Sequence, residues 1–285
     1  MPRSLTFLLL ICPYLAIAQV PGTEIWLVDL HDTQQAVSVA DQAINITRRP
    51  GYDNQPAFSN DGSQVLYTRM EGEATDIWAV DLAIRKAAAV TQTPESEYSP
   101  TPMAAGGFSV IRVEADGTQR IWAFDDQGTS PKLLLPDVAP AGYHAWFGDG
   151  AIGVFVLGEP HWLGVVEAGQ TSAARAAEDI GRGLRADPNG QLNFIQKKAG
   201  RNWLAQWVPG QIEPQILIPM PGQSEDFAWT PAGHVLVADG HTLMRWRPGD
   251  LDWSKVADLN TELHGTVTRL AVSPDGRRLA YVAAE

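Results

Sequence analysis

The stretch DIWAVD at residues 76–81 decides the fold of this chain, together with the turn DG at 61–62 and the apolar run VLY at 65–67. The same order returns with AG at 105–106 and RIWAFD at 120–125. Asp-Gly or Asn-Gly between β-rich runs is typical of a hairpin turn, because glycine accepts the positive φ that such a turn imposes. The unit is therefore a set of short antiparallel strands joined by tight turns.

This unit repeats along nearly the whole chain. Successive turn glycines are 40 to 44 residues apart, and a tryptophan-centred run follows most of them. Four short strands in about 43 residues is the spacing of a β-propeller blade. The six turn glycines are Gly62, Gly106, Gly150, Gly190, Gly233 and Gly276.

The two ends of the repeat set the number of blades. Residues 24–47 match only the third and fourth strands of a unit, and residues 265–283 match only the first and second. Five whole units and one split unit predict an all-β, six-bladed β-propeller of four-stranded blades. We expect the N-terminal and C-terminal strands to pair in one shared blade, which leaves no unpaired edge at the closure. The expected propeller covers residues 19–285, with no second domain.

The first 18 residues have the pattern of a secretory signal peptide. Arg3 precedes an apolar stretch from Leu5 to Ile17, and the small-x-small sequence AIA at 16–18 is typical of a cleavage site. Ile11 precedes the lone Cys12, where lipoprotein processing requires a small residue, so we expect no lipid anchor. No later apolar run is long enough to cross a bilayer. We therefore expect an exported protein, periplasmic or extracellular, that has no transmembrane segment and no disulfide.

Composition and charge exclude several classes of function. The 285 residues are 45% hydrophobic and 19% charged, which is too apolar for intrinsic disorder. Lys and Arg number 21 against 33 Asp and Glu, for a formal net charge of −12. An acidic chain lacks the basic surface that phosphate backbones and anionic lipids require. We expect no nucleic-acid partner and no docking on an anionic membrane.

Two segments resemble a known repeat. QPAFSNDG at 55–62, with the runs at 65–67 and 76–81, looks like the WD40-like repeat of TolB-type propellers, and LAVSPDGRRLAY at 270–281 is a second good copy. The three middle units depart from the pattern. The resemblance implies a six-bladed propeller of a kind that occurs as envelope scaffolds and as partner domains of peptidases. TolB carries an additional N-terminal domain, so the resemblance is to its propeller part alone.

The resemblance also directs the search for a binding site. In a propeller the first strand of each blade lines the central channel, and loops on a rigid scaffold tend to carry function. Positions seven and eight residues before each turn glycine should ring one mouth of this channel. They carry both charge signs and tyrosines, which suits recognition of a protein or peptide partner. Alternatively, they are polar loop residues that merely cap the ring. The candidate binding residues are Asn54, Gln55, Tyr98, Tyr143, His144, Arg182, Glu225, Asp226 and Arg269.

The sequence contains few signs of catalysis. It has no G-x-S-x-G and no H-E-x-x-H motif, and no EF-hand spacing. We expect no catalytic residue, no metal and no cofactor. His144 is a candidate general base or ligand, with a solvated loop histidine as the alternative. The adjacent acids Glu225 and Asp226 suit cation binding or acid–base work, with a solvated charged loop as the alternative.

Tryptophan is abundant, with ten residues in the chain. Most occupy equivalent positions in the repeat, where packing between blades needs large apolar side chains, so we expect core rather than a carbohydrate platform. They include Trp26, Trp78, Trp122, Trp162 and Trp203. Trp146 and Trp229 should lie on first strands, facing the core or the channel.

Three functions follow from these observations. The leading hypothesis is a non-enzymatic propeller that recognises a protein or peptide at its channel mouth. The second is an enzyme acting on a polysaccharide or peptide in the channel, which requires His144, Glu225, Asp226 and Arg269 to converge within hydrogen-bond reach. The third is a sensor that binds a small ligand.

Overall fold

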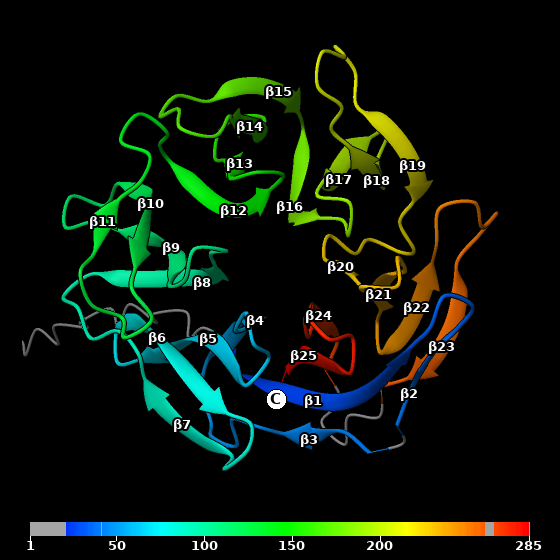
Figure 1. Ribbon diagram of the computed structural model, residues 1–285, viewed down its shortest axis with the longest axis horizontal. Coiled ribbons are helices and arrows are strands. Elements are labelled where there is room, and N and C mark those ends of the chain that lie inside the picture. Colours follow the sequence, from blue (N-terminus) through cyan, green and yellow to red (C-terminus); the bar gives the residue numbers. More distant parts are fainter. Residues whose placement is uncertain (1–20, 41, 260–264, 285) are drawn as a thin grey trace, which may run out of the picture.

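The chain forms a ring of β-sheets. The computed structural model describes residues 21–40, 42–259 and 265–284. In this part of the chain, strands β1 to β25 form six antiparallel sheets, and no segment is helical (Figure 1). None of these residues therefore belongs to a helix that could cross a membrane. The predicted six-bladed propeller is confirmed. The predicted signal peptide lies outside the described residues.

Five blades are continuous in sequence, and their first strands lie innermost (Figure 1). Blade 1 is β4 (Asp53–Phe58), β5 (Gln64–Glu71), β6 (Ala74–Asp81) and β7 (Lys86–Ala89). Blade 2 is β8 (Ser96–Pro102), β9 (Phe108–Val113), β10 (Gln119–Phe124) and β11 (Lys132–Leu133). Blade 3 is β12 (Ala141–Phe147), β13 (Ala151–Val156), β14 (Trp162–Val166) and β15 (Ala174–Glu178). Blade 4 is β16 (Ile180–Ala186), β17 (Leu192–Lys198), β18 (Arg201–Gln206) and β19 (Gln215–Pro219). Blade 5 is β20 (Ala228–Trp229), β21 (Val235–Asp239), β22 (Thr242–Trp246) and β23 (Ser254–Asp258).

Blade 6 joins the two ends of the described chain. It consists of β24 (Val267–Val272), β25 (Arg278–Ala284), β1 (Thr23–Asp32) and two short outer strands, β2 (Val37–Val39) and β3 (Ile44–Asn45). Strand β1 pairs with β25 along its length, with Trp26 opposite Tyr281. Its other edge carries β3 and then β2. The predicted closure by a shared blade is confirmed.

The turns form for the predicted reason. All six turn glycines have positive φ, between 70° and 98°. In blade 1 the amide of Gly62 donates to the carbonyl oxygen of Ser59, and the amide of Ser59 donates to that of Gln64. The Asp61 carboxylate accepts from the amide and hydroxyl of Ser63, which fixes the tip. Glycine at this position lets the chain reverse within one hairpin.

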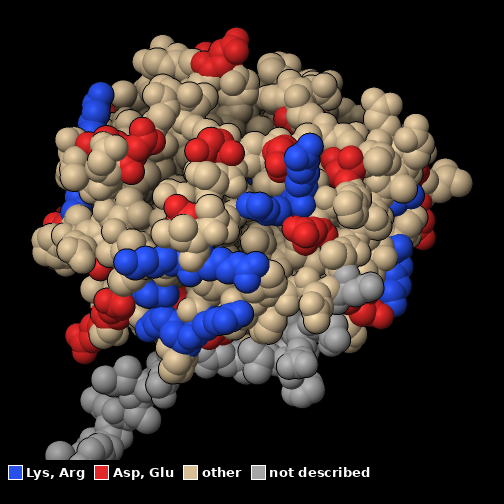
Figure 2. All heavy atoms as spheres, turned by 60° about the horizontal axis from the view of Figure 1, so that its bottom comes forward, with Lys and Arg blue, Asp and Glu red and all other residues tan. Residues whose placement is uncertain are grey.

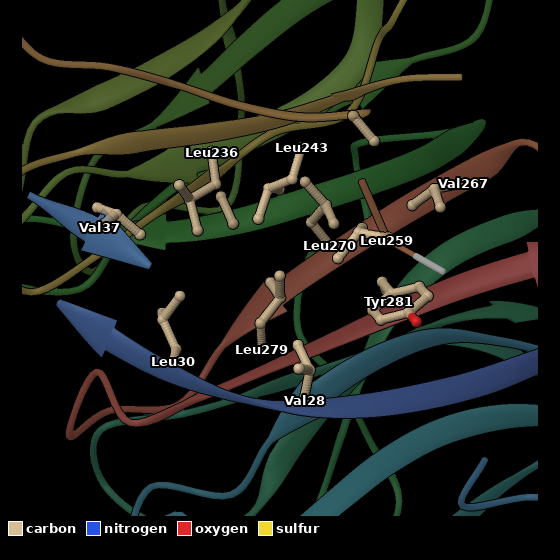
Figure 3. Close-up of a cluster of buried hydrophobic side chains, with 12 residues drawn as sticks. Val28, Leu30, Val37, Leu236, Leu243, Leu259, Val267, Leu270, Leu279 and Tyr281 are labelled. Atoms are coloured by element: carbon tan, nitrogen blue, oxygen red, sulfur yellow. The ribbon is translucent and has the colours of Figure 1, made fainter. Parts of the chain in front are cut away.

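The hydrophobic core lies between neighbouring blades. Figure 3 shows one such cluster, in which Val28 of β1 and Leu279 of β25 face Leu236 of β21 and Leu243 of β22. Leu236, Leu243 and Leu279 are fully buried. Each such side chain contributes about 2 kcal/mol through burial. Sheet-to-sheet packing of this kind holds the six inner strands in a fixed ring around the channel.

The repeat-equivalent tryptophans are half-buried. Four of them pack against hydrophobic clusters, as expected for core residues, whereas Trp203 belongs to none of these clusters. Arginine lies over the rings in several blades: the guanidinium of Arg69 lies 4.1 Å from the ring centre of Trp78, and that of Arg112 lies 4.9 Å from that of Trp122. Arg112 Nε also lies 3.2 Å from the carboxylate of Glu97. Burial raises the pKa of Glu97 to about 7, against the opposing effect of Thr93 and Arg112.

Candidate functional site

The six inner strands surround a cavity of about 290 Å³ in the channel. The positions seven residues before each turn glycine all line it, as expected for the mouth of a propeller channel. They are Gln55, Ser99, Tyr143, Gly183, Asp226 and Arg269.

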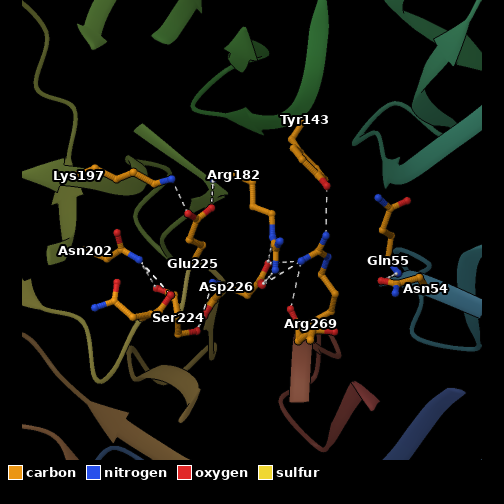
Figure 4. A network of polar contacts seen from close by, with 12 residues as sticks. Asn54, Gln55, Tyr143, Arg182, Lys197, Asn202, Ser224, Glu225, Asp226 and Arg269 are labelled. Atoms are coloured by element: carbon orange, nitrogen blue, oxygen red, sulfur yellow. Dashed lines mark hydrogen bonds and ion pairs between the residues drawn. The ribbon is translucent and has the colours of Figure 1, made fainter. Parts of the chain in front are cut away.

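A single carboxylate joins two arginines at this mouth (Figure 4). Asp226 precedes β20, and its two oxygens lie 2.9 and 3.0 Å from Nη1 of Arg269 on β24. Arg182 on β16 donates to the same carboxylate through Nη2 at 2.5 Å and Nε at 3.3 Å. Burial tends to lower the pKa of Arg182, but the hydrogen bond and charge of Asp226 outweigh it and raise that pKa. Partial burial makes these charge-assisted bonds strong, so they fix both guanidinium groups.

The same network crosses the channel. Arg269 donates through Nη2 to the hydroxyl of Tyr143 on β12 at 3.1 Å, and its guanidinium lies 5.6 Å from the centre of that ring. Strands β12 and β24 belong to blades on opposite sides of the ring (Figure 1). The contact between Arg269 and Tyr143 therefore spans the mouth, and we call the set Tyr143, Arg182, Asp226 and Arg269 the mouth network.

Glu225 supports this network from outside the cavity. Its carboxylate accepts from the amide of Arg182 at 3.2 Å and pairs with Nζ of Lys197 at 2.6 Å (Figure 4). The backbones of Gly183 and Glu225 approach each other closely here, because a Cβ added at Gly183 would lie 2.2 Å from the carbonyl oxygen of Glu225. Only glycine fits that contact. The alternative interpretation of Glu225 and Asp226 as a solvated charged loop is wrong, since both are ion-paired and partly buried.

Two candidates are held by the fold instead of lining the cavity. Asn54 is buried and donates to the hydroxyl of Thr23 on β1 at 3.2 Å. Tyr98 packs against the apolar cluster between blades 2 and 3. Gln55 does line the cavity, but its Oε1 already accepts from the hydroxyl of Thr68 and the amide of Ser99.

His144 lies inside the protein, and the alternative of a solvated loop histidine is wrong. It is 4% exposed, and its Nε2 lies 2.6 Å from the hydroxyl of Ser109, which also accepts from Nε1 of Trp146 at 2.9 Å. Burial, and then the charge of Arg185, lower the pKa of His144 to about 3. A histidine this hard to protonate is poorly matched to general-base work near neutral pH.

The four residues of the enzyme hypothesis do not converge. Asp226 and Arg269 are in contact, but His144 bonds to Ser109 in blade 2, and the Glu225 side chain is directed to Lys197. In residues 21–40, 42–259 and 265–284, no group of three His, Cys, Asp or Glu side chains could hold a metal ion.

Two residues at this site were not among the predicted candidates. Tyr52 lies beside the mouth network, where burial raises its pKa to about 12 against the opposing charge of Arg269. Arg185 lines the cavity on β16. The candidates were limited to the positions seven and eight residues before each turn glycine, whereas Arg185 lies five residues before Gly190, at a position that lines the cavity in the other blades too. Trp146 and Trp229 line the cavity on β12 and β20, as predicted.

Comparison with known proteins identifies solved structures that share this architecture. No protein-family model and no curated protein matches the sequence. Among solved structures, a protein assigned as TolB from Agrobacterium tumefaciens superposes with a TM-score of 0.71 at 16% identity, over 93% of this chain and 99% of that one. TolB from Acinetobacter baumannii gives a TM-score of 0.59 at 13% identity, over 91% of this chain and 64% of that one. The fold is that of a TolB propeller.

The TolB likeness concerns the fold, which enzymes share. A gluconolactonase from Xanthomonas campestris superposes with a TM-score of 0.66 at 12% identity, over 94% of this chain and 99% of that one. Identities this low establish architecture alone, because one propeller fold carries many functions. Function must therefore be argued from the channel.

Proposed function

We propose that this protein is an exported, non-catalytic propeller scaffold that binds a protein or peptide partner at the channel mouth. The observation that carries the proposal is the mouth network, in which tyrosine and arginine side chains are held rigidly around a cavity. Tyrosine and arginine are over-represented among the residues that dominate binding energy at interfaces. Their fixed positions lower the entropy cost of binding.

The chemistry of the mouth favours recognition over turnover. The carboxylate of Asp226 is committed to two arginines, and that of Glu225 to Lys197. Neither is left as a free acid or base, and the buried His144 does not reach them. This arrangement supports a rigid binding surface, as in the scaffold function implied by the TolB resemblance.

Export is part of the proposal and rests on residues 1–18. Basic and acidic side chains lie interspersed on the face seen in Figure 2, as on a soluble protein with a mixed surface. Such a face offers no large field of one sign to guide a highly charged partner.

The test is an affinity capture from envelope extract, using the exported protein as bait. The matched baits are the wild type, a mouth variant with Tyr143, Asp226 and Arg269 changed to Ala, and an outer-strand variant with Arg175, Glu178 and Lys255 changed to Ala. The outer-strand residues form exposed ion pairs on β15 and β23. Circular dichroism and thermal melts check that all three baits are folded.

The proposal predicts a protein captured by the wild type and the outer-strand variant but lost with the mouth variant. That protein, once purified, should bind the wild type directly in a titration. Equal capture by all three baits, or no partner that binds in the purified system, would refute the proposal.

A further inference from the structure

Arg185 is the charged side chain of the channel that the mouth network does not use. It lies on β16 three residues beyond Arg182, or about 10 Å further along the strand. Within the described residues its guanidinium has one hydrogen-bond partner, the carbonyl oxygen of Leu184 at 2.7 Å from Nη1, and no carboxylate within ion-pair distance. A guanidinium has several N–H donors in a fixed fork. Most of those on Arg185 remain available to a ligand.

The wall of the cavity carries an excess of positive charge. Arg182, Arg185 and Arg269 line it, and Asp226 is the one acidic side chain that does so among the described residues. Asp226 is already shared by Arg182 and Arg269, so Arg185 has no counter-charge of its own. Burial lowers the pKa of Arg185, yet an arginine in a protein stays protonated. This local excess contrasts with the net charge of −12 for the whole chain.

Other polar atoms in the cavity wall also lack partners. Nε1 of Trp229 and the hydroxyl oxygen of Ser99 are buried without a hydrogen-bond partner in the described structure. Both residues line the same cavity as Arg185. The indole N–H can only donate, and the hydroxyl can donate. Buried donors of this kind call for an acceptor, and a cation among them favours one with negative charge.

We propose that the channel contains a carboxylate-binding subsite centred on Arg185. A carboxylate accepts two parallel N–H bonds from a guanidinium, and its negative charge balances the excess in the wall. A volume of about 290 Å³ suits a small organic acid or one or two amino-acid side chains. The carboxylate comes either from a free dicarboxylic acid or from an acidic side chain of a peptide. The peptide source rests on the proposed function, whereas the free-acid source does not.

Calorimetric titration of the exported protein tests the subsite with two pairs of probes. Succinate is compared with neutral succinamide, and a blocked pentapeptide with one central glutamate is compared with the same peptide carrying glutamine. The variants are Arg185→Met, which removes the charge and keeps much of the stem, and Arg185→Lys, which keeps the charge and loses the fork. Arg201→Met is the matched control, because Arg201 is exposed and lies over Trp203 on the outside of blade 4.

The subsite predicts that succinate or the glutamate peptide binds at least about tenfold more tightly than its neutral counterpart. Arg185→Met should abolish that preference, Arg185→Lys should weaken it, and Arg201→Met should leave it unchanged. Binding of succinate identifies a free acid, and binding of the peptide alone identifies a peptide source.

Three results would overturn the subsite: no binding of either acidic probe, equal binding of acidic and neutral probes, or a preference that survives Arg185→Met. If Arg185→Met fails to fold, the outcome with Arg185→Lys decides, and unchanged affinity there counts against the subsite. Succinate binding without any captured partner would sustain the subsite and refute the scaffold proposal, so the two can fail separately.

Discussion

The buried His144 should make the stability of this protein sensitive to acid. Its folded-state pKa of about 3 lies below the ordinary value of 6.5, so the unfolded chain takes up a proton more readily than the folded one. The stability associated with neutral His144 is therefore fully present above pH 6.5 and is lost as the pH falls toward 3. From these two values, lowering the pH from 7.5 to 5.0 should cost about 2 kcal/mol of unfolding free energy at this residue.

Urea unfolding followed by tryptophan fluorescence at pH 7.5, 6.0 and 5.0 measures this effect. Other groups titrate in the same range, and the raised pKa values of Asp53 and Glu97 act in the opposite direction. The comparison that isolates the histidine is therefore wild type against His144→Gln. The control is His31→Gln, because His31 is exposed on β1.

The wild type and His31→Gln should lose about 2 kcal/mol more than His144→Gln between pH 7.5 and 5.0. His144→Gln itself should be less stable at pH 7.5, because the substitution disturbs the contact with Ser109 and Trp146. Parallel curves for wild type and His144→Gln would refute the reasoning, since they would mean that the folded protein accepts a proton on His144 as readily as the unfolded chain.

Three further substitutions test other parts of the structure. Gly183→Ala should lower the free energy of unfolding by about 3 kcal/mol, because the added Cβ would lie 2.2 Å from the carbonyl oxygen of Glu225. Urea unfolding measures this loss, and unchanged stability would contradict the close approach of the two backbones. Arg112→Met should lower the free energy of unfolding by about 3 kcal/mol at pH 8, because it leaves the Glu97 carboxylate buried without its ion pair. The loss should be smaller at pH 5, where Glu97 is protonated, and a loss that does not depend on pH in the same assay would contradict this explanation. Tyr143→Phe should cost about 1 kcal/mol in the thermal melt through loss of the bond across the channel, and no shift would show that this bond adds nothing.

The ring itself could be predicted from the sequence because its signals are local. A turn glycine with positive φ and a tryptophan-centred run are properties of a few neighbouring residues, and they recur at a nearly fixed interval. Adding up the units, including the split one, gives the number of blades and the shared blade without any knowledge of packing. The same count placed Tyr143, Asp226 and Arg269 at the channel, since the inner strand begins at a fixed distance from its turn.

The chemistry of the channel could be predicted only in part, because it depends on where side chains point. His144 follows Tyr143 directly, and successive residues on a strand face opposite sides, so the histidine bonds to Ser109 of the neighbouring blade while the tyrosine crosses the mouth. Asn54 precedes Gln55 and is likewise bonded to a neighbouring strand. Arg185 escaped detection because it lies two residues further along the inner strand than Gly183, at a position where the other blades carry alanine or threonine and give no sign of a binding site. Pairing of Asp226 with two arginines from different blades has no local signal at all.

The position of β1 between β25 and the outer strands sets the order in which the molecule can assemble. Trp26 finds its partner Tyr281 only after almost every other residue has been made, so blade 6 cannot exist on a partial chain. Contacts of such large sequence separation slow folding and make the final step cooperative. Strand β1 therefore stays unpaired along the edge that will contact β25 until β25 has been synthesised. For a protein proposed to leave the cytoplasm, this delay favours export of an unfolded chain. The ring would then close after the chain has crossed the membrane.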